Sequence, residues 1–199
     1  CQMNRGSMVF MPVTKTAPSK ETLVRIIQEI PTPFHLYDES AIRARVCALQ
    51  KAFAWNGGYR EYFAVKANPN PRIVQIPREE GCGVDCSSPT ELMLAQALGF
   101  SGEEIMFSSN MTPANEFEYA RSLNAIINLD DITHIDFLRR HGGIPERICL
   151  RYNPGGTLQF GTFVMGNPGE AKYGFTKEQL LIGVHKLMEL GVKSFGLHA

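Results

Sequence analysis

The sequence has no excess of charge of either sign and no long apolar run. Its 199 residues include 20 basic and 20 acidic side chains, and the formal net charge is zero. A balanced charge offers no basic surface for nucleic acid or for an anionic membrane, so we expect neither as a partner. No apolar stretch approaches the roughly 20 residues that a membrane-spanning helix needs. With 44% hydrophobic residues, the chain is expected to build one substantial globular core.

Cysteine is also scarce and irregularly placed. The cysteines are Cys1, Cys47, Cys82, Cys86 and Cys149. An odd count with no visible export signal favours reduced thiols in the cytoplasm. Cys82 and Cys86 are separated by three residues and lack a second cysteine pair, so we expect no metal site there.

Short apolar runs recur along the chain, and they are rich in β-branched residues. They are EYFAVKAN at 61–68, CGVDCSS at 82–88, EIMFSS at 104–109, NAIINLD at 124–130, RICLRYNP at 147–154 and KSFGLHA at 193–199. The first five begin about 21 residues apart, a spacing that suits a repeated strand, loop and helix. Nearly continuous apolar strands are expected where both faces of a sheet are covered.

The segments between these runs carry helix-start signals. The predicted starts are Asp38, Ser88 with Pro89 and Glu91, Thr112 with Pro113, Asp131, and Thr176 with Gln179. Gly142 and Gly191 are placed to end two of these helices. Pro77 is expected to break the helix after Asn70, so that this helix is short or kinked, because proline cannot donate the backbone hydrogen bond.

Alternating strands and helices predict an α/β fold with a parallel sheet and right-handed crossovers. No G-x-G-x-x-G motif follows a strand, which removes the usual dinucleotide signal and favours a barrel over an open sheet. A complete (β/α) barrel of the TIM type takes about 250 residues and eight strands. Six strand runs are present, so we expect an incomplete TIM-like barrel, with about six of the eight strands.

The lysine that ends the first run is a candidate functional residue. Because strand side chains alternate, Tyr62, Ala64 and Lys66 are expected to share one face, while Phe63 and Val65 face the helices. Lys66 would then point into the barrel at the carboxyl end of its strand, where barrel enzymes place their chemistry. An amine there could act as a Schiff-base nucleophile. The alternatives are a solvated lysine or one paired with a carboxylate.

Five motifs, in this order, carry a family resemblance: YFAVKAN, GVDCSSPTEL, LRYNPG, AKYGF and FGLHA. Together they resemble the pyridoxal-phosphate decarboxylases with an alanine-racemase-like barrel, and above all the diaminopimelate decarboxylases. The resemblance implies a pyridoxal-phosphate-binding barrel and a cytoplasmic, homodimeric enzyme of lysine biosynthesis that converts meso-diaminopimelate to L-lysine. It leaves open ornithine or arginine decarboxylase, carboxynorspermidine decarboxylase, and a regulatory homologue that has lost catalysis. The lysine motif continues as NPNPRI, which argues against alanine racemase.

The resemblance also assigns site residues. Lys66 matches the lysine that forms the Schiff base with pyridoxal phosphate, and Asp85 matches an acidic position beneath the cofactor. Arg151 matches an arginine on the fifth strand beside the cofactor ring, and Lys172 a lysine near the active site. His198 matches the first of two histidines on the sixth strand. The second histidine, which stacks on the cofactor in this family, would be residue 200, so no stacking role is assigned.

Several of these residues also have plainer interpretations. Asp85 could cap the turn after its strand, and Arg151 could pair with a carboxylate at the barrel rim. Glu91 is better explained by a capping box with Ser88. The other histidines are expected outside the site, with His134 on the surface. They are His35, His134, His141 and His185.

The expected division of the chain is unequal. Residues 1–30 are interpreted as the remnant of an expression tag followed by a lead-in helix, and residues 31–199 as the pyridoxal-phosphate-binding barrel. The phosphate-binding loop, a glutamate facing the pyridine nitrogen and a C-terminal β domain are typical of the family and are expected beyond residue 199. The 199-residue chain alone is therefore expected to be nearly inactive.

Overall fold

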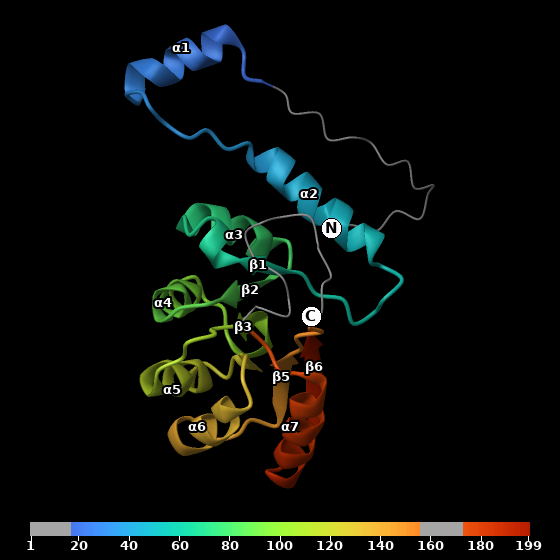
Figure 1. Ribbon diagram of the computed structural model, residues 1–199. Helices are drawn as coiled ribbons and strands as arrows, with labels where there is room; N and C mark the ends of the chain where they lie inside the picture. The colour runs from blue at the N-terminus through green and yellow to red at the C-terminus, as the bar shows by residue number, and fades with distance from the viewer. Residues whose placement is uncertain (1–16, 156–172) are drawn as a thin grey trace.

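Six parallel strands pair in chain order to form a single sheet (Figure 1). The computed structural model describes residues 17–155 and 173–199. The strands are β1 (Tyr62–Ala64), β2 (Gly83–Cys86), β3 (Ile105–Phe107), β4 (Ile126–Leu129), β5 (Arg147–Arg151) and β6 (Ser194–His198). Every neighbouring pair is parallel, and each strand lies within one of the six predicted runs. The prediction of an incomplete α/β barrel with a parallel sheet is thereby confirmed.

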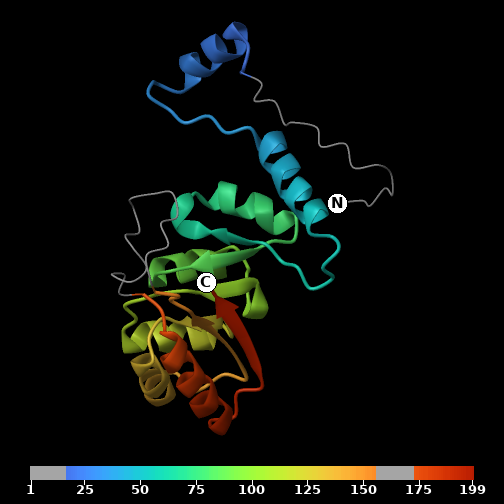
Figure 2. The same ribbon diagram turned by 45° about the vertical axis from the view of Figure 1, so that its right-hand side comes forward.

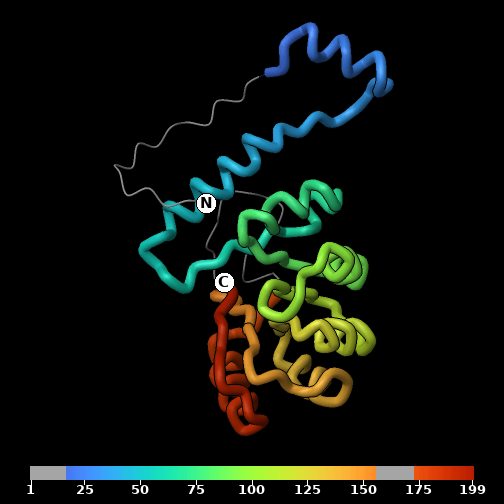
Figure 3. The backbone as a smooth tube through the Cα atoms, turned by 180° about the vertical axis from the view of Figure 1, so that it is seen from behind, coloured from blue at the N-terminus to red at the C-terminus, as the bar shows by residue number. Residues whose placement is uncertain are grey.

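Helices connect the strands and cover one face of the sheet. The helices are α1 (Lys20–Glu29), α2 (Glu39–Ala52), α3 (Pro71–Glu79), α4 (Pro89–Ala97), α5 (Ala114–Ser122), α6 (Thr133–His141) and α7 (Lys177–Glu189). Two short 3-10 turns, η1 (Val65–Ala67) and η2 (Gly102–Glu104), flank the first and third strands. Figure 3 shows α3 to α6 stacked one after another along the outside of the sheet.

The predicted caps explain most helix starts. The side chains of Asp38, Ser88 and Thr176 each accept a hydrogen bond from a backbone N–H in the first turn of α2, α4 and α7. At α7 the capping box is complete, because Gln179 reaches back to the backbone N–H of Thr176. Such caps satisfy backbone donors that have no partner within the helix.

Three helix details differ from the prediction. Thr112 does not cap α5: its hydroxyl donates to the carbonyl of Ser109, and Pro113 occupies the cap position. Asp131 accepts from the backbone N–H of Thr133, but one residue ahead of the assigned cap of α6. Pro77 does not break α3, which runs two residues past it before ending at Glu79.

The hydrophobic core lies between the sheet and its helices. Its largest completely buried side chains include Phe107, Phe117 and Phe175, which pack with aliphatic residues of β2 to β5. Ile127 and Leu129 of β4 belong to this core. Because strand side chains alternate, Asn128 between them faces the opposite, inner side of the sheet.

The N-terminal helices lie at one end of the sheet, and β6 lies at the other. In Figures 1 and 2, α1 stands apart from the strands, and none of its residues is buried. Arg43 of α2 forms ion pairs with Glu79 and Glu80 and so attaches α2 to α3. In β6, Leu197 is 63% exposed, as expected for the last strand of an incomplete barrel.

Candidate active site

A polar side chain stands at or near the carboxyl end of each of the six strands. In strand order they are Lys66, Asp85, Ser108, Asp130, Arg151 and His198. Since all the strands are parallel and pair in order, their carboxyl ends meet at the same edge of the sheet. Active sites of barrel enzymes are built at this edge. We refer to these six residues as the strand-end cluster.

Lys66 reaches the cluster by a different route from the one predicted. The strand does not continue to Lys66; β1 ends at Ala64, and Lys66 lies in η1. The turn is closed by the backbone N–H of Asn68, which donates to the carbonyl of Val65 at 3.1 Å, while the Val65 side chain is completely buried. Lys66 itself is exposed, and its charge acts on both Asp85 and His198. The alternation argument was therefore wrong about the strand, although Lys66 does lie in the strand-end cluster.

Asp85 is a partly buried carboxylate on the inner face of β2. Its backbone pairs with Ala64 on one side and Met106 on the other. The hydroxyl of Ser108 donates to its Oδ1 at 2.6 Å. Burial raises the pKa of Asp85, and the hydrogen bond from Ser108 and the charges of Lys66 and His198 oppose that rise. The carboxylate thus joins the end of β2 to β3 instead of serving only as a cap for its own turn.

Arg151 is held by a buried partner. Its Nη1 lies 2.9 Å from Oδ1 of Asp130, a residue that is only 3% exposed. Its guanidinium also lies 5.1 Å from the centre of the Tyr173 ring. The alternative that Arg151 pairs with a carboxylate is therefore confirmed. The pair does not remove Arg151 from the site, because Asp130 itself belongs to the strand-end cluster.

His198 is half-buried at the end of β6, and its backbone pairs with that of Arg151. Burial lowers its pKa, and the positive charge of Arg151 lowers it further. Asp85 and Asp130 act in the opposite direction. The four residues predicted for the site, Lys66, Asp85, Arg151 and His198, are thus brought into one electrostatic neighbourhood.

Three further residues were not identified from the sequence. Ser108 and Asp130 follow their strands directly, and Asn128 precedes Asp130 by two positions on the same face of β4. Asn128 is 2% exposed, and its amide oxygen and nitrogen have no hydrogen-bond partner among the described residues. The signal that could have found Ser108 and Asp130 is the polar residue at the end of an apolar run, as in "FSS" and "INLD".

Other candidates fall outside the cluster. Glu91 belongs to the start of α4, but the predicted capping box is only half formed: Ser88 caps the Glu91 N–H, while the Glu91 carboxylate accepts from the backbone N–H of Ser87 and the hydroxyl of Ser88. His134 is not a surface residue: its ring packs edge-on against Phe117, and burial lowers its pKa. His134 lies in the first turn of α6, and its ring contacts Phe117 of α5. Lys172 lies outside the described residues.

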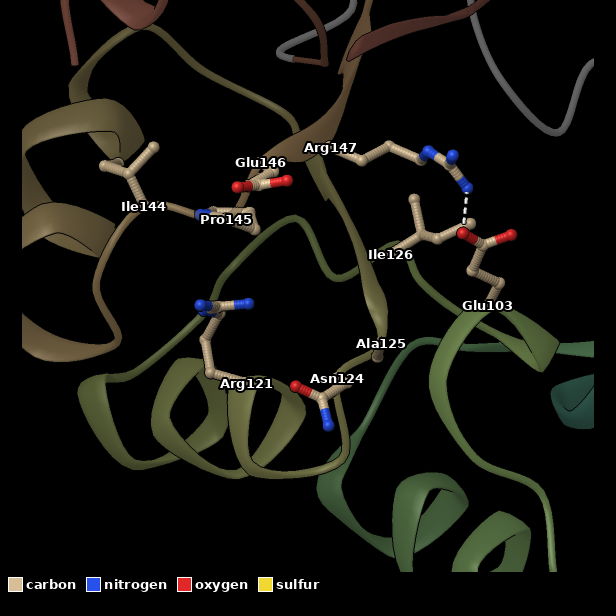
Figure 4. Close-up of a pocket in the computed structure, with 9 residues that line it drawn as sticks. All are labelled: Glu103, Arg121, Asn124, Ala125, Ile126, Ile144, Pro145, Glu146 and Arg147. Atoms are coloured by element: carbon tan, nitrogen blue, oxygen red, sulfur yellow. Dashed lines mark ion pairs between the residues drawn. The ribbon is translucent and has the colours of Figure 1, made fainter. Parts of the chain in front are cut away.

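A separate cavity lies at the opposite edge of the sheet (Figure 4). It has a volume of about 320 Å³ and is lined at the start of β4 by Ala125 and Ile126 and near the start of β5 by Glu146 and Arg147. Arg147 forms an ion pair with Glu103 at its rim. In barrels this edge serves stability rather than chemistry. The cavity is therefore not assigned to the active site.

Among residues 17–155 and 173–199, no group of three or more histidine, cysteine or acidic side chains is arranged to hold a metal ion. Among the same residues, no helix has the length and apolar character needed to cross a membrane.

Comparison with known proteins decides the family. The family described as "Pyridoxal-dependent decarboxylase, pyridoxal binding domain" matches residues 39–199. The chain belongs to this family. Its similarity to diaminopimelate decarboxylases confirms the resemblance seen in the sequence motifs, and the cofactor of the family is the predicted pyridoxal phosphate.

Individual relatives agree with this assignment. The chain is 35% identical to Protein TabA of Pseudomonas amygdali pv. tabaci, over 94% of this chain and 44% of that protein. It is 31% identical to the diaminopimelate decarboxylase of Thermoplasma acidophilum, over 84% of this chain and 40% of that protein. A solved structure of diaminopimelate decarboxylase from Helicobacter pylori, complexed with L-lysine, matches with a TM-score of 0.70 and 26% identity, over 81% of this chain and 42% of that one. The chain spans less than half the length of these relatives.

Proposed function

We propose that the protein is a pyridoxal-phosphate-dependent amino-acid decarboxylase that acts on meso-diaminopimelate and releases L-lysine. One observation carries the proposal: polar side chains, Lys66 among them, stand at six consecutive strand ends along one edge of the sheet. The family match supports the cofactor, and the similarity to diaminopimelate decarboxylases supports the substrate. The proposal places the enzyme in lysine biosynthesis, as a cytoplasmic homodimer whose residues 31–199 form the cofactor-binding barrel.

The residues of the cluster fit a pyridoxal cofactor. Lys66 offers an exposed primary amine to the cofactor aldehyde. The charge of Lys66 also acts on the nearby carboxylate of Asp85 and lowers its pKa. Arg151 is fixed by Asp130 and is suited to an anionic or aromatic group at the edge of the site. Burial and the charge of Arg151 lower the pKa of His198, which favours the neutral form of its ring. Bound pyridoxal phosphate supplies an electron sink for the carbanion left when carbon dioxide departs.

Each residue of this chain then has a defined task. Lys66 attaches the cofactor, and Asp85 places a negative charge beside the lysine amine. Arg151 and His198 lie at the neighbouring ends of β5 and β6 and would contact the cofactor from there. The apolar core behind the strands keeps these side chains on a rigid frame, which limits the reorganisation needed on binding.

The proposal is tested by following carbon dioxide release from the purified intact protein with added pyridoxal phosphate. The substrates are meso-diaminopimelate, L-ornithine, L-arginine and carboxynorspermidine. We expect turnover with meso-diaminopimelate at a kcat/KM well above that for the other three. Faster turnover of another substrate would overturn the assignment of the substrate. Cofactor binding with no turnover of any of them would favour the regulatory homologue.

A further inference from the structure

Asp130 is a buried carboxylate that no sequence motif singled out. It directly follows β4 and is 3% exposed. Its Oδ1 accepts a hydrogen bond from Nη1 of Arg151 at 2.9 Å, and its backbone carbonyl accepts from the N–H of Gly174 at 2.9 Å. Asp130 thereby connects the end of β4, the end of β5 and the segment that leads into α7.

Arg151 is fixed from more than one side. Its guanidinium is hydrogen-bonded to Asp130 and lies over the ring of Tyr173, and its backbone carbonyl accepts from the N–H of Phe175 at 2.7 Å. An unrestrained arginine side chain samples many rotamers, and ordering it costs conformational entropy. Here Asp130 and Tyr173 restrict the Arg151 side chain through contacts within the protein itself.

The fixed charge lies next to His198. The two residues pair across β5 and β6, and the charge of Arg151 acts on the imidazole more strongly than any other single charge. The groups that face His198 are Arg151 and Asp130 from β5 and β4, Asp85 from β2 and Lys66 from η1. Two of these groups are cationic and two are anionic, so the loss of one charge is expected to change the pKa of His198.

A purely structural ion pair is the competing explanation. Buried ion pairs are weak contributors to stability, and apolar residues of similar volume often replace them at no cost. A pair kept for stability alone could therefore lie anywhere in the core. This pair instead lies at the carboxyl edge of the sheet, beside the other members of the strand-end cluster.

We propose that Asp130 is a positioning residue of the active site, which holds the guanidinium of Arg151 beside His198 and offsets its charge there. The inference rests on the proposed function for its cofactor measurement, but its first measurement needs no cofactor. Asp130 does not act on the substrate directly; it acts through Arg151 and His198.

The first measurement is an NMR titration of histidine Cε1 in the intact protein, with selective ¹³C labelling and with His198→Gln to assign the signal. In Asp130→Asn we expect the pKa of His198 to fall below its value in the unaltered protein, because Arg151 then lacks a counter-charge. Asp130→Glu should restore it in part. The matched control is Asp136→Asn, which breaks the exposed ion pair with Lys186 and should leave the pKa of His198 unchanged. If the Asp130→Asn variant folds and the pKa of His198 is unchanged in it, the proposal is overturned.

A double variant covers the case in which Asp130→Asn fails to fold. Asp130→Asn with Arg151→Gln removes both charges, so neither partner is left buried and unpaired. The pKa of His198 should then rise, because the charge of Arg151 acts on it more strongly than that of Asp130. A pKa that stays unchanged or falls would contradict the proposed charge balance.

The second measurement is the affinity for pyridoxal phosphate, followed by absorbance. A charge-assisted hydrogen bond is worth about 1.5–3 kcal/mol, so we expect Asp130→Asn to weaken binding by about ten- to a hundredfold. Asp130→Glu should bind more tightly than Asp130→Asn. If both variants bind the cofactor equally weakly and the pKa of His198 is unchanged, Asp130 has only a structural role. Failure of the unaltered protein to bind the cofactor would overturn the proposed function and leave the titration result standing.

Discussion

The hydroxyl of Ser108 donates a 2.6 Å hydrogen bond to the carboxylate of Asp85 and so joins the carboxyl ends of β3 and β2. The bond compensates only part of the burial of Asp85, because burial remains the largest influence and raises its pKa. The free protein therefore keeps a carboxylate in surroundings that favour its protonated form. Residues placed for function often carry a cost of this kind in stability.

Asp85→Asn should stabilise the cofactor-free protein at neutral pH. A carboxyl group whose pKa is raised by folding stabilises the fold fully below its unfolded value, and this contribution is lost as pH rises through the folded value. At pH 7 the carboxylate is therefore a cost, and the amide removes it. We expect a gain of about 0.5–1 kcal/mol in the free energy of unfolding by urea at pH 7, which disappears near pH 3.

Asp136→Asn is the control, because the pKa of Asp136 is shifted in the opposite direction to that of Asp85. Lys186 lowers the pKa of Asp136, so that carboxylate stabilises the fold above its unfolded pKa and loses this effect as pH falls. Neutralising Asp136 should not stabilise the protein at pH 7. A loss of stability in Asp85→Asn at pH 7 would contradict the account of Asp85.

Asn128→Leu should also stabilise the cofactor-free protein. Leucine has the same branched shape as asparagine, and the amide of Asn128 is buried with no partner among the described residues. An unsatisfied buried polar group costs about 1–3 kcal/mol, so we expect a gain of about 1 kcal/mol in urea unfolding. Asn128→Ala separates polarity from packing, since it removes the amide but leaves a void, and should be less stable than Asn128→Leu. A destabilised Asn128→Leu would show that a buried water or another group satisfies the amide.

Gly174→Ala should disturb the support of Arg151. Gly174 has a φ of +90°, and an added Cβ would lie 3.0 Å from both the carbonyl oxygen of Arg151 and the backbone nitrogen of Asn153. Gly191 has a similar φ of +95° but open space around the added Cβ, so Gly191→Ala measures the backbone cost alone. That cost is about 1 kcal/mol, and we expect Gly174→Ala to lose about 1–2 kcal/mol more. Equal losses of stability in urea would contradict the close packing at Gly174.

The sequence predicted the features that depend on local chemistry. The apolar runs became the six strands, and the caps at Ser88 and Thr176 began their helices, because each signal lies within a few residues. It failed at β1, where a local turn closed by Asn68 ends the strand before Lys66. It also failed where a tertiary contact decides, because the burial of His134 depends on Phe117 of another helix.

The candidate site was predicted only in part, because some of its residues are marked by local motifs and others only by contacts between distant parts of the chain. Lys66, Asp85, Arg151 and His198 came from motifs and do lie near one another. Asp130 was missed although "INLD" ends a predicted strand. Its importance lies in the contact with Arg151, which is 21 residues away in the sequence. Such a partner is found only once the register of β4 and β5 is known.

The central claim is that Lys66 is the residue that attaches pyridoxal phosphate. The most direct measurement is borohydride reduction of the intact protein with the cofactor, followed by proteolysis and mass spectrometry of the labelled peptide. We expect the pyridoxyl label on Lys66. Lys66→Ala should lose the label and reduce turnover by about a thousandfold or more, while Lys51→Ala, at the exposed end of α2, should keep both. A label on Lys172 or any other lysine, with full activity in Lys66→Ala, would contradict the account.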